Sequence, residues 1–261
     1  MRIACGYRIL DGNELAWIDK AKDEGFTHME FASQNLPSDP DAAARVVAYA
    51  RELGFSLSIH APFGATNLTS PDAAVRAESV ERVADAIRFA ARHLIDLVCL
   101  HPGRLGGIEG EPSAEENLAL MKTTLRELGA LAREGGVRLA LENMEARPNE
   151  LVHSVAELNE FAPLAAENPY FGVTVDFSHY LTLGEGLPPL SELELPIFDV
   201  HLSQTVEGKP HFSLERTDGI ADLPAIVSAL RAYGYGGPIV LEVREGHGES
   251  YRILKEIVNC S

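Results

Sequence analysis

Short apolar runs that end on a histidine, an aspartate or a glutamate recur along the chain. Side chains of a β-strand alternate between two faces. In each run the terminal residue shares its face with smaller or more polar residues, as His60 does with Ser58, while the opposite face is bulky and aliphatic. This pattern predicts strands that pack helices on one face and present a chemical site on the other. The six runs are SLSIH (56–60), DLVCLH (96–101), VRLALE (137–142), GVTVD (172–176), FDVH (198–201) and IVLE (239–242).

The segments between these runs have the spacing of amphipathic helices. Two further strand-like runs, RIAC (2–5) and THMEF (27–31), raise the number of expected strands to eight. One helical segment carries apolar residues at Val80, Val83, Ile87, Ala91 and Leu94, and another at Leu118, Met121, Leu125, Leu128 and Ala132.

Glycines at the joints between helix and strand support the same alternation. Gly25, Gly54, Gly135 and Gly234 each precede a strand at the place where a left-handed helix cap would fall. Eight repeats of strand, loop, helix and strand predict an α/β fold, a (β/α)8 TIM barrel forming a single domain over residues 1–261. The longest irregular stretches, 61–72, 102–113, 177–190 and 203–220, follow strands, where such a barrel keeps its active-site loops.

The composition of the chain restricts the kinds of partner that we expect it to bind. The chain of 261 residues has 39 acidic and 22 basic residues and a formal net charge of −17, which argues against a nucleic-acid partner or an anionic membrane surface. Three cysteines without a C-x-x-C pair favour a reduced, cytoplasmic compartment. We find no apolar stretch long enough for a signal peptide or a membrane span. The sequence is compatible with a homo-oligomer.

The strand ends supply the candidate chemistry. Glu142, Asp176, His201 and Glu242 come from four different runs and offer an oxygen-rich site suited to Mn²⁺, Mg²⁺, Co²⁺ or Zn²⁺. Without a cation, these ionisable groups would repel one another at one barrel mouth. We therefore expect one divalent metal on these four residues.

Four further histidines extend this site. His60 and His101 flank Glu142 in the expected strand order, and two imidazoles with a bridging carboxylate favour a second zinc ion. Direct contact of His60 and His101 with a substrate is an equally good interpretation. For His179 and His211 we expect hydrogen bonds to the substrate rather than metal ligation.

Several segments resemble the xylose isomerase-like TIM-barrel superfamily, which includes sugar-phosphate isomerases and epimerases, ketose 3-epimerases, inosose dehydratases and endonuclease IV. The ordered series Glu…Asp-x-x-His…His…Glu carries the resemblance. The segments are IHAPFGATNLTSPD (59–72), LHPG (100–103), LENM (141–144), VTVDFSHY (173–180), VHLSQ (200–204) and TDGIADLPAIVSALRAYGYGGPIVLEV (217–243).

The resemblance implies two alternative ligand sets. Ketose epimerases of this superfamily hold one metal on the four positions named above, with His179 at the substrate. Endonuclease IV holds three zinc ions and would add His60, His101, His179 and His211, but its aspartate two residues before the last histidine is Lys209 here. Because a cation at this position weakens a third metal site, we expect Lys209 to bind a phosphate or carboxylate of the substrate.

The leading functional hypothesis is a divalent-metal-dependent isomerase or epimerase of a small ketose or related polyol-ketone. Glu142 and Glu242 would transfer protons on opposite sides of an enediolate, with the second oxygen of each ligand carboxylate free to act as the base. The alternative is a metal-dependent phosphoester hydrolase that resembles endonuclease IV and acts on a small phosphodiester. A non-catalytic sugar-binding barrel is the second alternative.

Overall fold

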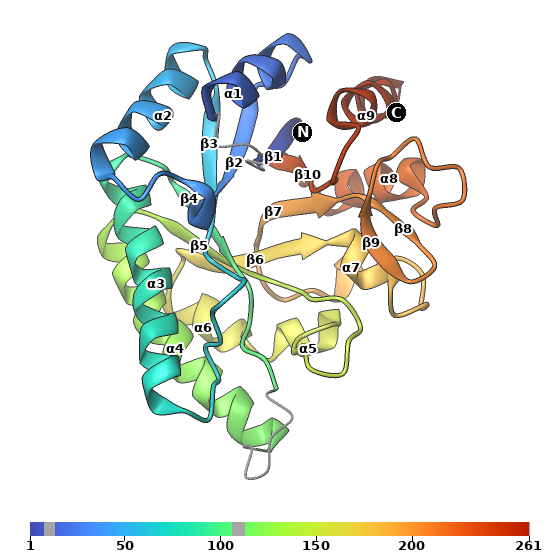
Figure 1. Cartoon of the computed structure of the whole chain (residues 1–261). Helices are drawn as coiled ribbons and strands as arrows, with labels where there is room; N and C mark the ends of the chain where they lie inside the picture. Colours follow the sequence, from blue (N-terminus) through green and yellow to red (C-terminus); the bar gives the residue numbers. More distant parts are fainter. Residues whose placement is uncertain (8–13, 106–112, 261) are drawn as a thin grey trace.

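Eight parallel strands close into a barrel in the computed structural model of the chain, which describes residues 1–7, 14–105 and 113–260 (Figure 1). The closed order is β1-β10-β7-β6-β5-β4-β3-β2. All eight strands expected from the sequence are present, which confirms the (β/α)8 barrel. Their bounds are β1 Arg2–Tyr7, β2 His28–Ala32, β3 Ser56–His60, β4 Leu97–Leu100, β5 Arg138–Glu142, β6 Phe171–Asp176, β7 Ile197–Leu202 and β10 Pro238–Leu241.

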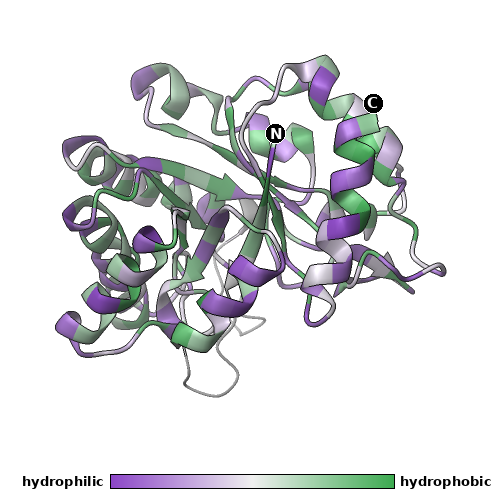
Figure 2. Cartoon of the chain, turned by 90° about the horizontal axis from the view of Figure 1, so that it is seen from above, coloured by the Kyte–Doolittle hydropathy of each residue, from purple (hydrophilic) through white to green (hydrophobic). Residues whose placement is uncertain are grey.

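The two faces of each strand divide as the alternation predicts. Leu57 and Ile59 of β3 belong to the hydrophobic core between barrel and helices, and so do Val173 and Val175 of β6. Ser58, on the opposite face, is fully buried in the barrel interior. In Figure 2 the strands carry mostly hydrophobic colours, whereas the helices mix hydrophilic and hydrophobic stretches. Burial of each large apolar side chain contributes roughly 1.5–3 kcal/mol, so the outer faces of the strands stabilise the barrel while the inner faces are available for polar groups.

Helices cover the barrel between most strands. The two segments with the best helical spacing form α3 and α4, which begin at side-chain caps from Asp72 and Ser113. Leu94 is an exception, because α3 ends at Arg92 and Leu94 is exposed with φ of 53°. The long helices are α1 Glu14–Asp23, α2 Pro40–Glu52, α3 Ala73–Arg92, α4 Ala114–Glu134, α8 Leu223–Tyr233 and α9 His247–Cys260. None of the helices in the described ranges combines the length and apolar character that a membrane span requires.

The glycine prediction is right at three joints and shifted at the fourth. Gly25, Gly54 and Gly234 have φ between 84° and 97°, as a left-handed cap requires. After α4, however, Gly135 has φ of −81° and the following Gly136 takes the left-handed position at φ of 67°. Because two glycines stand next to each other, the sequence alone does not choose between them.

The connections after β5, β6 and β7 depart from the expected repeat. After β5 the short helices α5 Val155–Asn159 and α6 Ala162–Glu167 replace a full-length one, and after β6 the short helix α7 Phe177–Leu181 does so. After β7 a hairpin precedes the full-length α8. Gly184, Gly186 and two consecutive prolines, Pro188 and Pro189, follow α7 and do not support a longer helix. The described chain also forms short 3-10 turns at η1 Ser33–Asn35 and η2 Leu190–Glu192. Of the predicted loop 102–113, residues 106–112 lie outside the described residues.

An antiparallel hairpin occupies the predicted loop 203–220. It consists of β8 Gln204–Val206 and β9 Lys209–Phe212, joined by Glu207 and Gly208, which both have positive φ as a tight hairpin turn needs. The hairpin, drawn in orange in Figure 1, returns the chain towards β7. The backbone N–H of His211 donates to Ser203 Oγ, and its carbonyl accepts from the N–H of Arg244. These bonds attach His211 to the barrel mouth.

Candidate functional site

All six strand-end residues predicted from the sequence lie at the carboxyl-terminal mouth of the barrel. His60, Glu142 and Asp176 are the last residues of β3, β5 and β6. His201 stands one residue before the end of β7, and His101 and Glu242 directly follow β4 and β10. One ligand atom from each of the four predicted metal ligands lies within 4.8 Å of those of the other three; these residues are Glu142, Asp176, His201 and Glu242. The structure therefore brings this set together.

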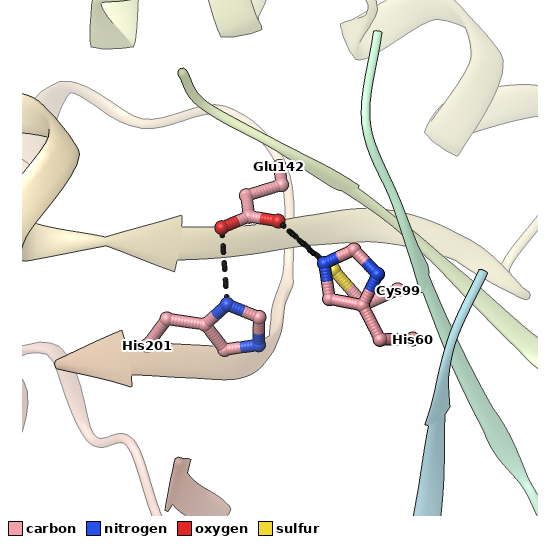
Figure 3. Close-up of side chains that lie close together, drawn as sticks. All are labelled: His60, Cys99, Glu142 and His201. Atoms are coloured by element: carbon pink, nitrogen blue, oxygen red, sulfur yellow. Dashed lines mark hydrogen bonds and ion pairs between the residues drawn. The ribbon is translucent and has the colours of Figure 1, made fainter. Parts of the chain in front are cut away.

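Glu142 lies at the centre of the cluster. Its Oε1 is 3.0 Å from His201 Nδ1, and its Oε2 is 3.3 Å from His60 Nε2 (Figure 3). The same Oε2 lies 3.2 Å from His101 Nε2. The Cys99 thiol also donates to Oε2 at 3.4 Å. The sequence-based expectation that one oxygen of this carboxylate stays free is wrong, because imidazoles contact both oxygens and the side chain is fully buried.

Burial and mutual contact shift the pKa values of these groups. Burial alone would raise the pKa of Glu142, but the imidazoles of His201 and His101 hold it well below its usual value. Burial raises the pKa of Asp176 to about 6, against the opposing effect of His179. Burial would lower the pKa of His60, yet contact with Glu142 raises it to about 9. The buried acids and imidazoles thus depend on one another, or on a cation, for their charge.

His201 contacts carboxylates on both edges of its ring. Besides Glu142 at Nδ1, Glu30 Oε1 lies 3.1 Å from Nε2, and Asp199 Oδ2 lies 3.8 Å from the same nitrogen. Ser58 donates to the other oxygen of Glu30. Sequence reasoning did not select Glu30, although it alternates with the bulky Met29 and Phe31 in the same way as the strand-end ligands.

A second group of side chains crosses the mouth above the first. His179 Nε2 lies 3.4 Å from His211 Nε2, and His211 Nδ1 lies 3.5 Å from Glu242 Oε2. Glu145 Oε2, which the sequence analysis did not select, is 3.4 Å from His179 Nε2. His179, His211 and Glu242 could also hold a metal ion by their spacing. The roles of His179 and His211 as substrate contacts stay predictions.

A cavity of about 400 Å³ opens over these residues. Lys209 does not line it, because this residue lies at the turn of the β8–β9 hairpin and is exposed. The cations on the wall are three arginines instead. The lining residues are Gly6, Glu30, Ala32, Asn35, His60, Phe63, His101, Arg104, Met144, Glu145, Arg147, Glu150, His179, His211, Glu242 and Arg244.

The residues present fit a divalent cation. Asp176 Oδ2 is buried and has no hydrogen-bond partner, and its ion-pair contact with His179 Nδ1 is long at 3.5 Å, so a bound cation would compensate its charge. Three carboxylates and one imidazole within 4.8 Å are a donor set typical of Mn²⁺, Mg²⁺, Co²⁺ or Zn²⁺. A second set with softer donors, suited to zinc, consists of His60, Cys99, Glu142 and His201.

Comparison with known proteins agrees with this geometry. The family profile described as xylose isomerase-like TIM barrel matches residues 18–257, nearly the whole chain. The chain belongs to this family. Within the xylose isomerase-like family, its sequence relatives include a probable endonuclease 4 of Symbiobacterium thermophilum, 28% identical over 191 residues, which are 70% of this chain and 66% of that protein.

Solved structures of similar fold include sugar epimerases and a related protein. A D-tagatose 3-epimerase-like protein superposes with a TM-score of 0.84 and 23% identity, covering 99% of this chain and 98% of that one. A D-psicose 3-epimerase from Clostridium cellulolyticum H10, solved with D-tagatose, gives a TM-score of 0.78 and 20% identity over 100% of this chain and 92% of that one. At these identities the likeness establishes a shared fold.

Proposed function

We propose that this protein is a divalent-metal-dependent isomerase or epimerase of a small ketose or related polyol-ketone. The observation that supports it is the convergence of Glu142, Asp176, His201 and Glu242 within 4.8 Å beneath a cavity of about 400 Å³. This volume falls in the usual range of small-molecule sites. Two structural neighbours are named a D-tagatose 3-epimerase-like protein and a D-psicose 3-epimerase, and these names point to the same substrate class.

The four converging residues would hold the metal. When bound, it would polarise a substrate carbonyl and its adjacent hydroxyl and so acidify the C–H between them. Glu242 is the member of the set that lines the cavity, with 18% of its side chain exposed. Although burial opposes it, His201 lowers the pKa of Glu242 to about 2, so the carboxylate is ionised at neutral pH, as a metal ligand has to be. In this proposal Glu242 removes the substrate proton.

Proton return on the opposite face is assigned to Glu142. Its carboxylate is fully buried, but His60 and His101 cover its Oε2 and both line the cavity. We assign the exchange of protons between Glu142 and the substrate to these two imidazoles. His179 and His211, which also line the cavity, would orient the substrate hydroxyls by hydrogen bonds.

One observation favours a second candidate, a metal-dependent phosphoester hydrolase. Glu142 contacts His201 with one oxygen and the pair His60 and His101 with the other, an arrangement that suits a carboxylate bridging two metal ions. Two such ions can generate hydroxide and stabilise a phosphoryl group. The net charge of −17 and Lys209 in the place of a third-site carboxylate argue for a small phosphodiester rather than DNA. A non-catalytic sugar-binding barrel does not need the paired carboxylates around a metal.

A parallel substrate screen separates the two activities. Purified protein is supplied with Mn²⁺, Co²⁺, Mg²⁺ or Zn²⁺ and incubated with ketoses, inososes, hydroxypyruvate and bis(nitrophenyl) phosphate. Epimers or aldose isomers detected by NMR, without release of nitrophenolate, support the isomerase. Release of nitrophenolate without isomerisation of any ketone would replace it with the hydrolase.

A further inference from the structure

The charged side chains on the cavity wall are nearly all paired with one another. Glu145 lies 2.6 Å from the guanidinium of Arg147, and Glu150 lies 3.2 Å from that of Arg104. The two other lining carboxylates, Glu30 and Glu242, contact His201 and His211. Each carboxylate of the wall therefore has a cationic or imidazole partner within the protein.

Arg244 is the exception among the three arginines of the wall. Within the described ranges, no carboxylate lies within 4.0 Å of its guanidinium, and its side chain is exposed at the cavity. In a chain with a net charge of −17, acidic groups are abundant, so an unpaired arginine on a cavity wall is available for a ligand. An arginine matches carboxylate and phosphate oxygens with two parallel hydrogen bonds.

The backbone fixes Arg244 next to the proposed catalytic carboxylate. Arg244 follows Glu242 by two residues, and the intervening Val243 is fully buried, so Glu242 and Arg244 both face the cavity. The N–H of Arg244 donates to the carbonyl of His211 at 3.1 Å, which ties this segment to β9. β10 ends at Leu241, and the chain bends at Arg244, so the two side chains line the cavity at neighbouring positions. This arrangement suits a substrate whose reacting carbons lie at Glu242 while its far end reaches Arg244.

The remaining wall on this side leaves room for such an end group. Gly6 of β1 lines the cavity without a side chain, and a Cβ there would come within 2.9 Å of the Leu241 carbonyl. The amide of Asn35 lines the same cavity and can donate a hydrogen bond. Among the residues that the structure describes, Arg244 has no carboxylate partner that an anion would have to displace.

We propose that the substrate is an anionic ketose, with a phosphate monoester or a carboxylate at the end remote from the reacting carbons, and that Arg244 binds this group. The proposal rests on the proposed function for the position of the reacting carbons. The sequence suggests Lys209 as the residue that binds the anion, but Lys209 does not line the cavity. Arg244 takes its place in this proposal.

The test compares three probes on the metal-loaded protein: D-tagatose, D-tagatose 6-phosphate and the corresponding hexulosonic acid, D-tagaturonate. Binding is measured by calorimetry and turnover by NMR, for the parent protein and for Arg244→Gln. We expect at least one anionic probe to bind at least tenfold more tightly than D-tagatose. Because a charge-assisted pair is lost, Arg244→Gln should weaken this binding roughly ten- to hundredfold, with unchanged metal content and, where turnover occurs, mainly through KM.

Two further variants are matched controls for charge. Arg133→Gln removes the same charge from the last turn of α4, which leads into the opposite end of the barrel, and should leave the preference intact. Lys209→Gln removes the cation of the β8–β9 hairpin and should also leave the preference for the anionic probe intact. The inference is overturned if neither anion binds better than D-tagatose, if the preference survives in Arg244→Gln, or if Lys209→Gln rather than Arg244→Gln removes it.

The same measurements keep the two proposals apart. Binding of an anionic ketose that depends on Arg244, without turnover of any ketose, would retain the anion site and reject the isomerase. Turnover of D-tagatose that is as efficient as that of both anionic probes would retain the isomerase and reject the anion site.

Discussion

Glu30 Oε1 lies 3.1 Å from His201 Nε2, on the edge of the imidazole opposite to the one that faces Glu142. Both residues are almost completely buried. Glu142 and Glu242, two of the proposed metal ligands, lie on the Nδ1 side, at 3.0 and 3.8 Å. A histidine that binds a metal through one nitrogen usually donates its other N–H to a carboxylate. We therefore expect His201 to bind the metal through Nδ1 and to keep Nε2–H towards Glu30.

Removing the charge of Glu30 tests this assignment. We expect Glu30→Gln to lower the affinity for Mn²⁺ or Zn²⁺ roughly 10- to 100-fold. The substitution makes the His201 ring less basic and holds its orientation less firmly, but it removes none of the proposed metal ligands. Calorimetric titration of the metal-free protein measures the change. Glu150→Gln, which removes a carboxylate paired with Arg104 from the same cavity, is the control and should retain the affinity. Equal affinity of Glu30→Gln and the parent protein would contradict this role.

Substitution of the proposed metal ligands should have larger effects than substitution of Glu30. Asp176→Ala and His201→Ala each remove one donor from a four-donor set, so we expect both to abolish tight binding of the metal. Elemental analysis of the protein purified without added metal gives the stoichiometry. One Mn or Co per chain that persists in His101→Ala agrees with the isomerase. Two zinc ions per chain, reduced to one in His101→Ala, would favour the hydrolase.

The sequence predicted the barrel and the convergence of the strand-end residues because both follow from alternation along single strands. His60, Glu142 and Asp176 occupy the last position of buried strands, and parallel strands in a barrel end at the same mouth. The same alternation could have identified Glu30. It lies in the middle of a strand, whereas the search selected residues at strand ends.

Contacts that depend on loops could not be predicted in this way. The β8–β9 hairpin turns His211 to the mouth and leaves Lys209 outside the cavity, although both residues lie in one four-residue strand. Glu145 reaches His179 from a segment without regular structure after β5. Short-range periodicity carries no information on such loop paths, which depend on packing between distant segments.

Acid should destabilise the protein in part through His28. Burial lowers the pKa of this residue to about 4, against an ordinary value of 6.5, and its ring nitrogens contact Ser56 and Ser58 in the barrel interior. Between these values the unfolded chain binds a proton that the folded chain does not, so the stability contribution is complete above pH 6.5 and is lost as the pH falls towards 4. The difference corresponds to ~3 kcal/mol at most.

Denaturant unfolding of the parent protein and His28→Gln at pH 7.5 and pH 5 measures this contribution. The variant should lose less stability on acidification than the parent, whatever its stability at pH 7.5. His93→Gln replaces a histidine that is only partly buried, and its pH dependence should stay closer to that of the parent. Identical pH dependence in His28→Gln and the parent would refute the prediction.

The two proposed proton-transfer residues should differ in their response to amide substitution. Of the two, Glu242 is the one that lines the cavity. Because Glu242→Gln removes the proposed base, we expect kcat to fall roughly 10²- to 10⁴-fold at saturating metal. Glu142→Gln should also lower kcat severely, but with a marked loss of metal affinity, because an amide at the centre of the imidazole cluster weakens several contacts. Titration with metal during the assay separates the two effects. Full activity of either variant would remove that residue from the mechanism.

Exchange of substrate hydrogen with solvent is the most direct test of the proposed isomerase. In deuterium oxide, the metal-loaded protein should incorporate deuterium at the carbon next to the carbonyl of its ketose, even where net conversion is small, because exchange needs only removal of the proton and its return. NMR of ketoses, their phosphates and acids, inososes and hydroxypyruvate should reveal this exchange, and Glu242→Gln should suppress it. No exchange with any of these ketones, together with hydrolysis of bis(nitrophenyl) phosphate, would contradict the isomerase and establish the hydrolase in its place.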